Sequence, residues 1–198
     1  MFVSFEGLDG SGKTTQAKRL ARRLQGEGRE VVSTREPGGT PLGERLRELL
    51  LGGADVSPWA EAALFAAARA EVVERVIGPA LERGADVVCD RYIDSSLAYQ
   101  GIARGLGIDA VLDLNLATVE GLLPDRTFLL LVEPREALRR CGRKLDRIER
   151  QGAEFLAAVD TAYRQLAERF PERIVALEGN RPPDEIGSLV HEELRQRS

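Results

Sequence analysis

Apolar residues in this chain form short runs, and segments with helical spacing of apolar positions separate them. The runs predict strands at residues 2–6, 30–34, 86–90, 127–132 and 174–177. The run at 127–132 is apolar almost throughout, which is typical of a central parallel strand covered on both faces. Strands that alternate with helices predict a parallel sheet with helices on both faces. We therefore expect a three-layer α/β fold with a five-stranded parallel sheet.

The segments between these strands predict most of the helices. Amphipathic or strongly capped patterns are found at residues 13–25, 42–51, 57–83, 109–121, from 134 onward, 152–170 and 183–196. In the longest of them, Ser57 is expected at the N-cap and Pro58 at the first helical position. Gly78 and Pro79 should kink this helix or divide it in two. Residues 91–107 are expected to form a loop with a short helix.

The first strand leads into a glycine-rich turn that fits the pattern G-x-x-x-x-G-K-[ST], namely Gly7-Leu8-Asp9-Gly10-Ser11-Gly12-Lys13-Thr14. Glycines let backbone N–H groups turn inward around an anion, and the following helix adds the positive end of its dipole. Lys13 can reach the β- and γ-phosphates, and the Thr14 hydroxyl can ligate Mg²⁺. With Thr15 beside it, the turn predicts a nucleoside-triphosphate site, against the alternative of an ordinary glycine-rich turn.

Three further polar pairs follow predicted strands, and ligands of such sheets bind outside the carboxyl ends of the strands. They are Arg35-Glu36, Asp90-Arg91 and Asn180-Arg181. Asp90 is expected to hold Mg²⁺ through water. Arg91 stands where hydrolytic ATPases commonly place a glutamate, and its planar guanidinium suits a second phosphate. The alternative for Asp90-Arg91 is a surface salt bridge.

Composition restricts the class of protein further. The 198 residues and a net charge of −4 predict one domain and favour neither a nucleic-acid nor a membrane partner. Two cysteines without a C-x-x-C pattern favour a reducing, cytoplasmic setting. No apolar stretch approaches the length of a membrane span, and no targeting segment is expected. A guanine-reading N-K-x-D pattern is absent from the sequence, which argues against a GTPase.

Over essentially its whole length, the chain resembles the thymidylate kinases of the bacterial type. The matching stretches are Glu6 to Thr15, Thr34 to Thr40, Phe65 with Arg69, Asp90 to Gly101, and Leu145 to Glu149. The resemblance implies a P-loop NTPase-type fold and transfer of the γ-phosphoryl group from ATP to dTMP with Mg²⁺, which gives dTDP and ADP. It also implies a homodimer, for which one helix offers the apolar residues Ala60, Ala63, Leu64, Ala67 and Ala68.

The resemblance assigns roles around the acceptor nucleotide. Asp9 would accept a hydrogen bond from the 3′-hydroxyl of the sugar, although a partner of the helix dipole is the alternative. Thymine would stack on Phe65, and Tyr92 would exclude a 2′-hydroxyl. The other residues implied around dTMP are Arg35, Glu36, Arg47, Arg69, Arg91, Ser96 and Gln100. Asn180 and Arg181 would lie against adenine.

A strongly basic stretch, at about 139–151, is expected to form a short lid. Such a run is usually a solvated helix face, but phosphoryl transfer benefits from arginines that close over the transferred group. The family has one form with arginine at the position of Gly10 and one whose lid supplies the arginines, and Gly10 places this chain in the second. Arg143 and Arg147 are the lid candidates, and Lys13 and Arg91 complete the predicted catalytic set.

Two alternatives remain open at this point. One is another nucleoside or nucleotide kinase of the same fold, with a deoxynucleoside or UMP as acceptor. The pairs Phe65/Arg69 and Ser96/Gln100 favour thymine instead. The other is a non-catalytic nucleotide-binding switch, which the basic lid argues against because a switch stabilises no transition-state charge.

Overall fold

A single parallel sheet organises the computed structural model, which describes residues 1–53, 55–142 and 147–196. Its strand order is β2-β3-β1-β4-β5. The strands are β1 Phe2–Glu6, β2 Val31–Arg35, β3 Asp86–Asp90, β4 Arg126–Leu131 and β5 Ile174–Glu178. All four strand pairings are parallel, so the predicted five-stranded parallel sheet is confirmed, with strand ends that differ by no more than one residue.

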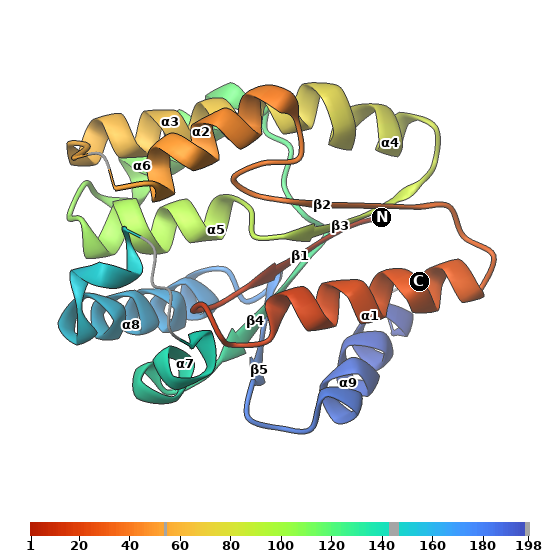
Figure 1. The fold of residues 1–198 in the computed structure, drawn as a ribbon. Coiled ribbons are helices and arrows are strands. Elements are labelled where there is room, and N and C mark those ends of the chain that lie inside the picture. The colour runs from red at the N-terminus through yellow and green to blue at the C-terminus, as the bar shows by residue number, and fades with distance from the viewer. Residues whose placement is uncertain (54, 143–146, 197–198) are drawn as a thin grey trace.

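Helices cover both faces of the sheet, as predicted. Helices α1 (Lys13–Gly26) and α9 (Pro183–Arg195) lie side by side on one face, where Leu20 and Ile186 pack with Phe5 and Phe128 of the strands (Figure 1). The apolar core of the other face includes residues of α3 (Pro58–Val72), α4 (Gly78–Glu82), α5 (Ile93–Ser96), α6 (Ile108–Thr118) and α8 (Ala153–Arg169). Helix α2 (Pro41–Leu51) packs against α3, and α7 (Pro134–Cys141) contacts α8.

The helix expected over residues 57–83 is present as contiguous helical turns, and its regular α-helical pattern changes just before Gly78-Pro79, where a kink or division was predicted. Helix α3 ends at Val72, and the π-helical turn η1 (Val73–Ile77) separates it from α4. Pro79 lacks the N–H that a continuous helix needs, and wide helical turns form where the hydrogen-bond ladder shifts. Ser57 takes the predicted N-cap position but makes no capping hydrogen bond with its side chain.

Residues 91–107 hold more helix than predicted. Helix α5 continues into the π-helical segment η2 (Leu97–Ala103), which packs against α8. Leu97, Ala98 and Gln100 are buried there, so tertiary packing, and not local propensity, stabilises this segment. The short 3₁₀ turn η3 (Glu149–Gln151) precedes α8.

The carboxyl ends of the strands bring the predicted polar pairs to one edge. In the sheet register, Phe5 of β1 and Arg35 of β2 both lie opposite Asp90 of β3. The glycine-rich turn Gly7–Thr14, called the phosphate loop from here on, leaves β1 at the same edge. None of the helices in the described ranges combines the length and apolarity that crossing a membrane requires.

Candidate active site

Glycine backbone conformations shape the phosphate loop. Gly7 has φ 133° and Gly10 has φ 80°, conformations that residues with side chains rarely adopt. A Cβ atom at Gly7 would lie 2.4 Å from the Leu130 carbonyl oxygen, and one at Gly10 would lie 2.3 Å from the Ala137 carbonyl oxygen. Gly12 occupies the N-cap of α1, so no side chain covers the N–H groups of the first turn. The loop keeps an anion-binding concavity, and position 10 has no room for an arginine.

Three charged side chains meet where the phosphate loop faces β3. Asp9 Oδ1 accepts a hydrogen bond from Arg91 Nη2 at 2.7 Å and lies 3.4 Å from Lys13 Nζ. Lys13 Nζ also donates to the Leu8 carbonyl oxygen at 2.8 Å. Burial would raise the pKa of Asp9, but the charges of Arg91 and Lys13 lower it well below its usual value. Two cations face one carboxylate here, and the net positive charge suits phosphate groups.

Two oxygen ligands suited to a divalent cation lie beside this cluster. The Thr14 hydroxyl is hydrogen-bonded to Asp90 Oδ2 at the carboxyl end of β3. Hydroxyl and carboxylate oxygens are the hard ligands that Mg²⁺ prefers, so the pair fits a magnesium–nucleotide complex. Among the described residues, no group of three or more potential metal ligands is found. Substrate phosphates and water would therefore complete the coordination shell.

A cavity opens next to the charge cluster and reaches α3. Its wall brings together seven residues that the sequence placed around the acceptor, among them two arginines, two carboxylates and an aromatic ring. They are Asp9, Glu36, Arg47, Phe65, Arg91, Ser96 and Gln100. Arg47 Nη1 donates to the Pro37 carbonyl oxygen at 3.0 Å, which holds its guanidinium near the wall. The cavity therefore has the charge distribution that a nucleoside monophosphate requires.

Arg69 lies buried behind this wall, with a side chain that is 1% exposed. Its guanidinium pairs with Glu36 Oε2 at 2.7 Å, donates to Ser96 Oγ and the Tyr92 carbonyl oxygen at 3.0 Å each, and also bonds Asn115 Oδ1. Burial raises the pKa of Glu36 to about 7, although Arg69 lowers it. Glu36 Oε1 and Arg69 Nε are buried and have no hydrogen-bond partner among the described residues.

Gln100 also lines this cavity. Its Nε2 donates to Glu61 Oε1 at 2.9 Å, and this contact fixes the amide orientation because only the NH₂ group can face a carboxylate. Gln100 Oε1 is buried and has no partner in the described part of the chain. Burial would raise the pKa of Glu61, but the hydrogen bonds from Gln100 and from Arg147 lower it. An ionised Glu61 therefore keeps the Gln100 carbonyl oxygen available for an N–H group of a ligand.

Tyr92 does not line the cavity. It is fully buried, with its ring edge-on to Phe2 at a centroid distance of 4.9 Å. Its hydroxyl donates to the Leu122 carbonyl oxygen at 3.0 Å. These are the contacts of a core aromatic residue with a satisfied polar end. The structure thus places Tyr92 in the core, and the expectation that it lies beside the sugar remains a prediction.

Sequence reasoning missed Tyr99, which does line the cavity. The Arg91 guanidinium lies 5.6 Å from the centroid of its ring. The only available signal was its place within the stretch Asp90 to Gly101. Arg35 does not line the cavity: its side chain is 53% exposed and its Nη2 pairs with Glu44 at 2.9 Å. Its expected place around the acceptor phosphate remains a prediction.

A second groove lies on the other side of the phosphate loop, and Thr15, Asn180 and Arg181 contribute to its wall. Arg140 also lines it and donates to Asn180 Oδ1 at 2.8 Å. Arg181 is paired with Glu185 at 2.5 Å. The expected adenine residues therefore lie together here. The sequence did not distinguish Arg140 from the other cations of the basic stretch.

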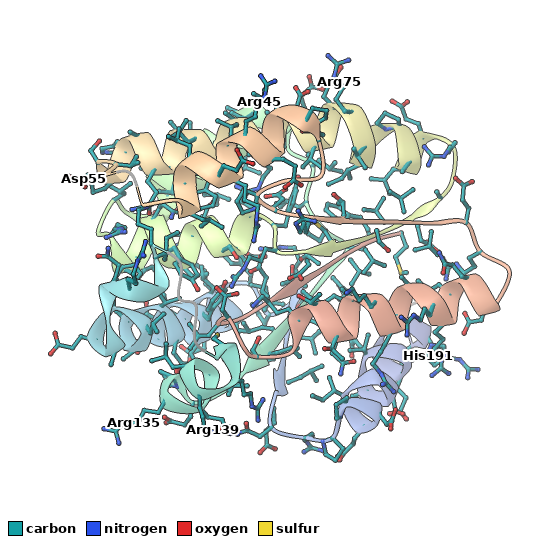
Figure 2. All side chains as sticks on the ribbon, in the orientation of Figure 1. Arg45, Asp55, Arg75, Arg135, Arg139 and His191 are labelled. Atoms are coloured by element: carbon teal, nitrogen blue, oxygen red, sulfur yellow. The ribbon has the colours of Figure 1, made fainter. Side chains whose placement is uncertain are left out.

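The structure separates the members of that basic stretch. Arg139 points away from the molecule on α7, is 72% exposed and pairs with Glu136 (Figure 2). Arg147 is largely buried, pairs with Glu61, and donates from Nε to the Leu50 carbonyl oxygen at 2.7 Å. Arg143 lies outside the described residues. The Arg147 guanidinium thus faces Glu61, and its expected contact with the transferred phosphoryl group remains a prediction.

The strand order, the phosphate loop and the adjoining cavity together define a class. A P-loop fold binds the triphosphate at the end of β1, and the cavity beside it offers both phosphate ligands and a base pocket to a second nucleotide. Two adjoining sites suited to phosphate at one sheet edge are the arrangement expected of a P-loop nucleoside monophosphate kinase.

Comparison with known proteins narrows this class to one family. The family model of thymidylate kinase matches residues 5–190. The thymidylate kinase of Pelotomaculum thermopropionicum is 48% identical over 195 residues, which cover 96% of this chain and 88% of the relative. That of Symbiobacterium thermophilum is 46% identical over 204 residues, which cover 100% of this chain and 95% of the relative. This chain belongs to the thymidylate kinase family.

A solved structure agrees with this assignment. The crystal structure of thymidylate kinase from Ehrlichia chaffeensis superposes with a TM-score of 0.81 at 32% sequence identity. The match covers 98% of each chain. The fold is therefore shared from end to end, and not only around the phosphate loop.

Proposed function

We propose that this protein transfers the γ-phosphoryl group of ATP to dTMP, giving dTDP and ADP. One observation carries the proposal: a single cavity joins cationic groups at the phosphate loop to an apolar ring and an amide acceptor near α3. The cationic end suits the phosphate of the acceptor nucleotide. The other end suits a pyrimidine base with an N–H donor.

Thymine fits the available contacts at the α3 end. Phe65 offers an aromatic face for stacking. Gln100 Oε1 is a buried acceptor without a partner in the described chain, and thymine N3–H is a donor that would satisfy it. Arg69 Nε is an unpartnered donor behind the wall for a base carbonyl oxygen. A cytosine ring has an unprotonated N3 and would leave the Gln100 oxygen without a donor.

The chemistry needs no general base. The attacking oxygen belongs to a phosphate monoester whose second pKa is about 6, so it is largely ionised at neutral pH. Catalysis then consists of positioning and charge compensation. Arg91 and Arg47 would hold the acceptor phosphate, and Lys13 would leave the Leu8 carbonyl oxygen for the β- and γ-phosphates. Mg²⁺, held by Thr14 and through water by Asp90, would neutralise charge on the transferred group.

The donor nucleotide would lie along the phosphate loop, with adenine in the groove of Arg140, Asn180 and Arg181. Because a Cβ atom at Gly10 would meet the backbone of α7, any arginine over the transferred group must come from elsewhere. We propose the lid at about 139–151 as its source, within a single nucleoside monophosphate kinase domain spanning residues 1–198. The predicted candidates Arg143 and Arg147 stay in this proposal.

We also propose a cytoplasmic homodimer. Helices α2 and α3 lie side by side, and three large apolar side chains on them stay exposed, namely Leu42, Leu49 and Trp59. Ala60, Ala63 and Ala67 are exposed on α3, so a second copy could approach its backbone closely. Ala68, which the sequence placed on this face, is buried in the core of its own subunit.

A coupled assay of ADP release with ATP and Mg²⁺ tests the function. We expect turnover with dTMP, slower turnover with dUMP, and little with UMP, CMP, AMP or thymidine. Lys13→Ala should lower kcat about 10³-fold because the charge opposing the phosphates is lost, while the thermal unfolding midpoint stays near that of the wild type. Equal rates with CMP and dTMP, or ADP release without an acceptor, would refute the proposal.

A further inference from the structure

The last residue of β1, Glu6, is a fully buried carboxylate that the chemistry above does not use. It forms no ion pair with any residue that the structure describes. Its Oε1 atom accepts hydrogen bonds from the backbone N–H groups of Tyr92 at 2.7 Å and Ser95 at 3.2 Å. Its Oε2 atom accepts from Ser95 Oγ at 2.6 Å and from the Tyr163 hydroxyl at 3.0 Å. Four donors therefore hold this buried carboxylate in a fixed orientation.

The same two hydroxyl groups also contact Arg91. Arg91 Nη1 donates to Ser95 Oγ at 3.0 Å and to the Tyr163 hydroxyl oxygen at 3.2 Å, while Nη2 reaches Asp9 at 2.7 Å. Arg91 itself has φ 72°, an uncommon conformation for a residue with a side chain. Ser95, Tyr163 and Asp9 thus hold the guanidinium of Arg91, a residue that lines the cavity.

Hydrogen positions follow from this arrangement. Each hydroxyl group has one hydrogen and two lone pairs. Glu6 is an acceptor, so Ser95 donates its hydrogen to Oε2, and the Tyr163 hydrogen goes to Oε2 or to Ser95 Oγ, which lies 3.0 Å away. Neither hydrogen then points at Arg91, and both hydroxyl oxygens present lone pairs to its N–H groups.

We infer that Glu6 is a positioning residue for phosphoryl transfer: it orients the hydroxyl groups of Ser95 and Tyr163 so that they hold the Arg91 guanidinium toward the acceptor phosphate. This inference rests on the proposed role of Arg91. Glu6 touches no substrate in this arrangement and acts only through the two hydroxyl groups. Burial and the nearby charge of Asp94 raise the pKa of Glu6, so its ionised form depends on these donors.

The variant Glu6→Gln tests hydrogen-bond direction with almost no change of shape. The amide oxygen can still accept from the N–H groups of Tyr92 and Ser95, so the backbone contacts are kept. The amide NH₂ then faces Ser95 Oγ and the Tyr163 hydroxyl and donates to both. One hydroxyl can still donate to the other, but the second hydrogen has lost its carboxylate acceptor and competes with Arg91 Nη1 for the space around its oxygen.

Calorimetric titration with dTMP and with thymidine gives a readout that a general structural role would not give. Thymidine lacks the phosphate but keeps the base and sugar. We expect Glu6→Gln to raise the Kd for dTMP about tenfold and to leave the Kd for thymidine unchanged. Tyr163→Phe should raise the Kd for dTMP about threefold. The double variant Glu6→Gln with Tyr163→Phe should raise the Kd for dTMP by less than the product of the two single effects. The reason is that the Tyr163 hydroxyl, which Glu6→Gln misdirects, is absent from it.

Asp86→Asn is the matched control, because Asp86 is also a buried carboxylate of the sheet but lies at the amino end of β3, paired with Arg29. It should lower the unfolding midpoint without changing either Kd. Arg91→Ala separates the two possible failures. If Arg91→Ala keeps normal dTMP affinity, the proposed role of Arg91 is wrong. If it weakens dTMP binding while Glu6→Gln does not, only the inference about Glu6 is wrong.

Two other outcomes would also overturn the inference. One is a Glu6→Gln variant that weakens dTMP and thymidine binding equally, because that pattern reports a disturbed pocket and not a disturbed guanidinium. The other is a Tyr163→Phe variant with an unchanged ratio of the two affinities. This second measurement decides the question even if Glu6→Gln does not fold.

Discussion

The two nucleotide sites of this kinase are built in opposite ways. On the acceptor side, Arg69 and Gln100 are each 1% exposed and bonded to other buried side chains. On the donor side, Asn180 and Arg181 are exposed, and the Arg181 guanidinium pairs with two carboxylates near the surface. The backbone N–H groups of the phosphate loop are the donor site's main fixed feature.

This difference indicates where selectivity resides. A ligand that leaves a buried polar group unpaired binds at a large cost, so we expect the proposed acceptor pocket to discriminate strongly. Backbone N–H groups recognise phosphates that every nucleoside triphosphate carries, and exposed side chains add little. We therefore expect strict choice of the acceptor base and looser choice of the donor base.

The largest effect should follow from breaking the acceptor side at Arg69. Arg69→Ala leaves Glu36 as an unpaired buried carboxylate and removes a donor from Ser96 and Asn115. We expect the free energy of unfolding to fall by about 4 kcal/mol, since breaking a buried ion pair strands its partner. In the folded fraction, the KM for dTMP should rise much more than the KM for ATP.

Urea unfolding and steady-state kinetics measure these two effects. The double variant Arg69→Ala with Glu36→Gln is the control, because it replaces the unpaired buried carboxyl by an amide that cannot ionise and should recover part of the lost stability. A similar rise in both KM values would show that Arg69 supports the fold and does not specify the acceptor.

Much of the acceptor side could be predicted from the sequence, for identifiable reasons. The glycine-rich turn can be recognised from the spacing of its residues. The strands that end near residues 6, 35 and 90 bring Asp9, Glu36 and Arg91 to one edge of the sheet. Phe65 and Arg69 lie one helical turn apart, and the wall of the cavity does include Phe65, with Arg69 behind it. These relations are local or follow from parallel strand geometry.

The long-range contacts that complete the acceptor pocket could not be predicted from the local sequence. Glu61 meets Gln100 and Arg147 across separations of 39 and 86 residues, and Asn115 reaches Arg69 across 46. Tyr99 lines the cavity from the π-helical segment η2, which packs against α8. Partners chosen by tertiary packing cannot be inferred from spacing along the chain.

A second test of the acceptor side uses pH. The pKa of Glu36 is about 7 in the fold against 4.5 for an unperturbed carboxyl, chiefly because of burial. Between these two values the folded protein holds more protons than the unfolded chain, so stability falls as pH rises. We expect the wild type to lose up to about 3 kcal/mol relative to Glu36→Gln across this range.

Denaturant unfolding of both proteins at about pH 5 and about pH 8 measures this difference. The comparison with Glu36→Gln isolates Glu36 from other titrating groups. If the wild type instead gains stability relative to the variant as pH rises, the Arg69 charge outweighs burial. The pocket would then be held by a fully ionised pair.

The smallest effect should come from the donor side. Arg140 is half-buried and donates to Asn180 Oδ1 and to the Gly179 carbonyl oxygen, contacts that lie partly in solvent. Arg140→Ala should raise the KM for ATP by no more than about fivefold and leave the KM for dTMP unchanged, because a partly exposed side chain contributes little binding free energy. Arg139→Ala, which removes an outward-pointing cation of the same helix, is the matched control and should change neither value. A fall of about 100-fold in kcat for Arg140→Ala would contradict this contrast between a buried acceptor side and an open donor side. It would show that a cation of the donor side acts on the transferred phosphoryl group itself.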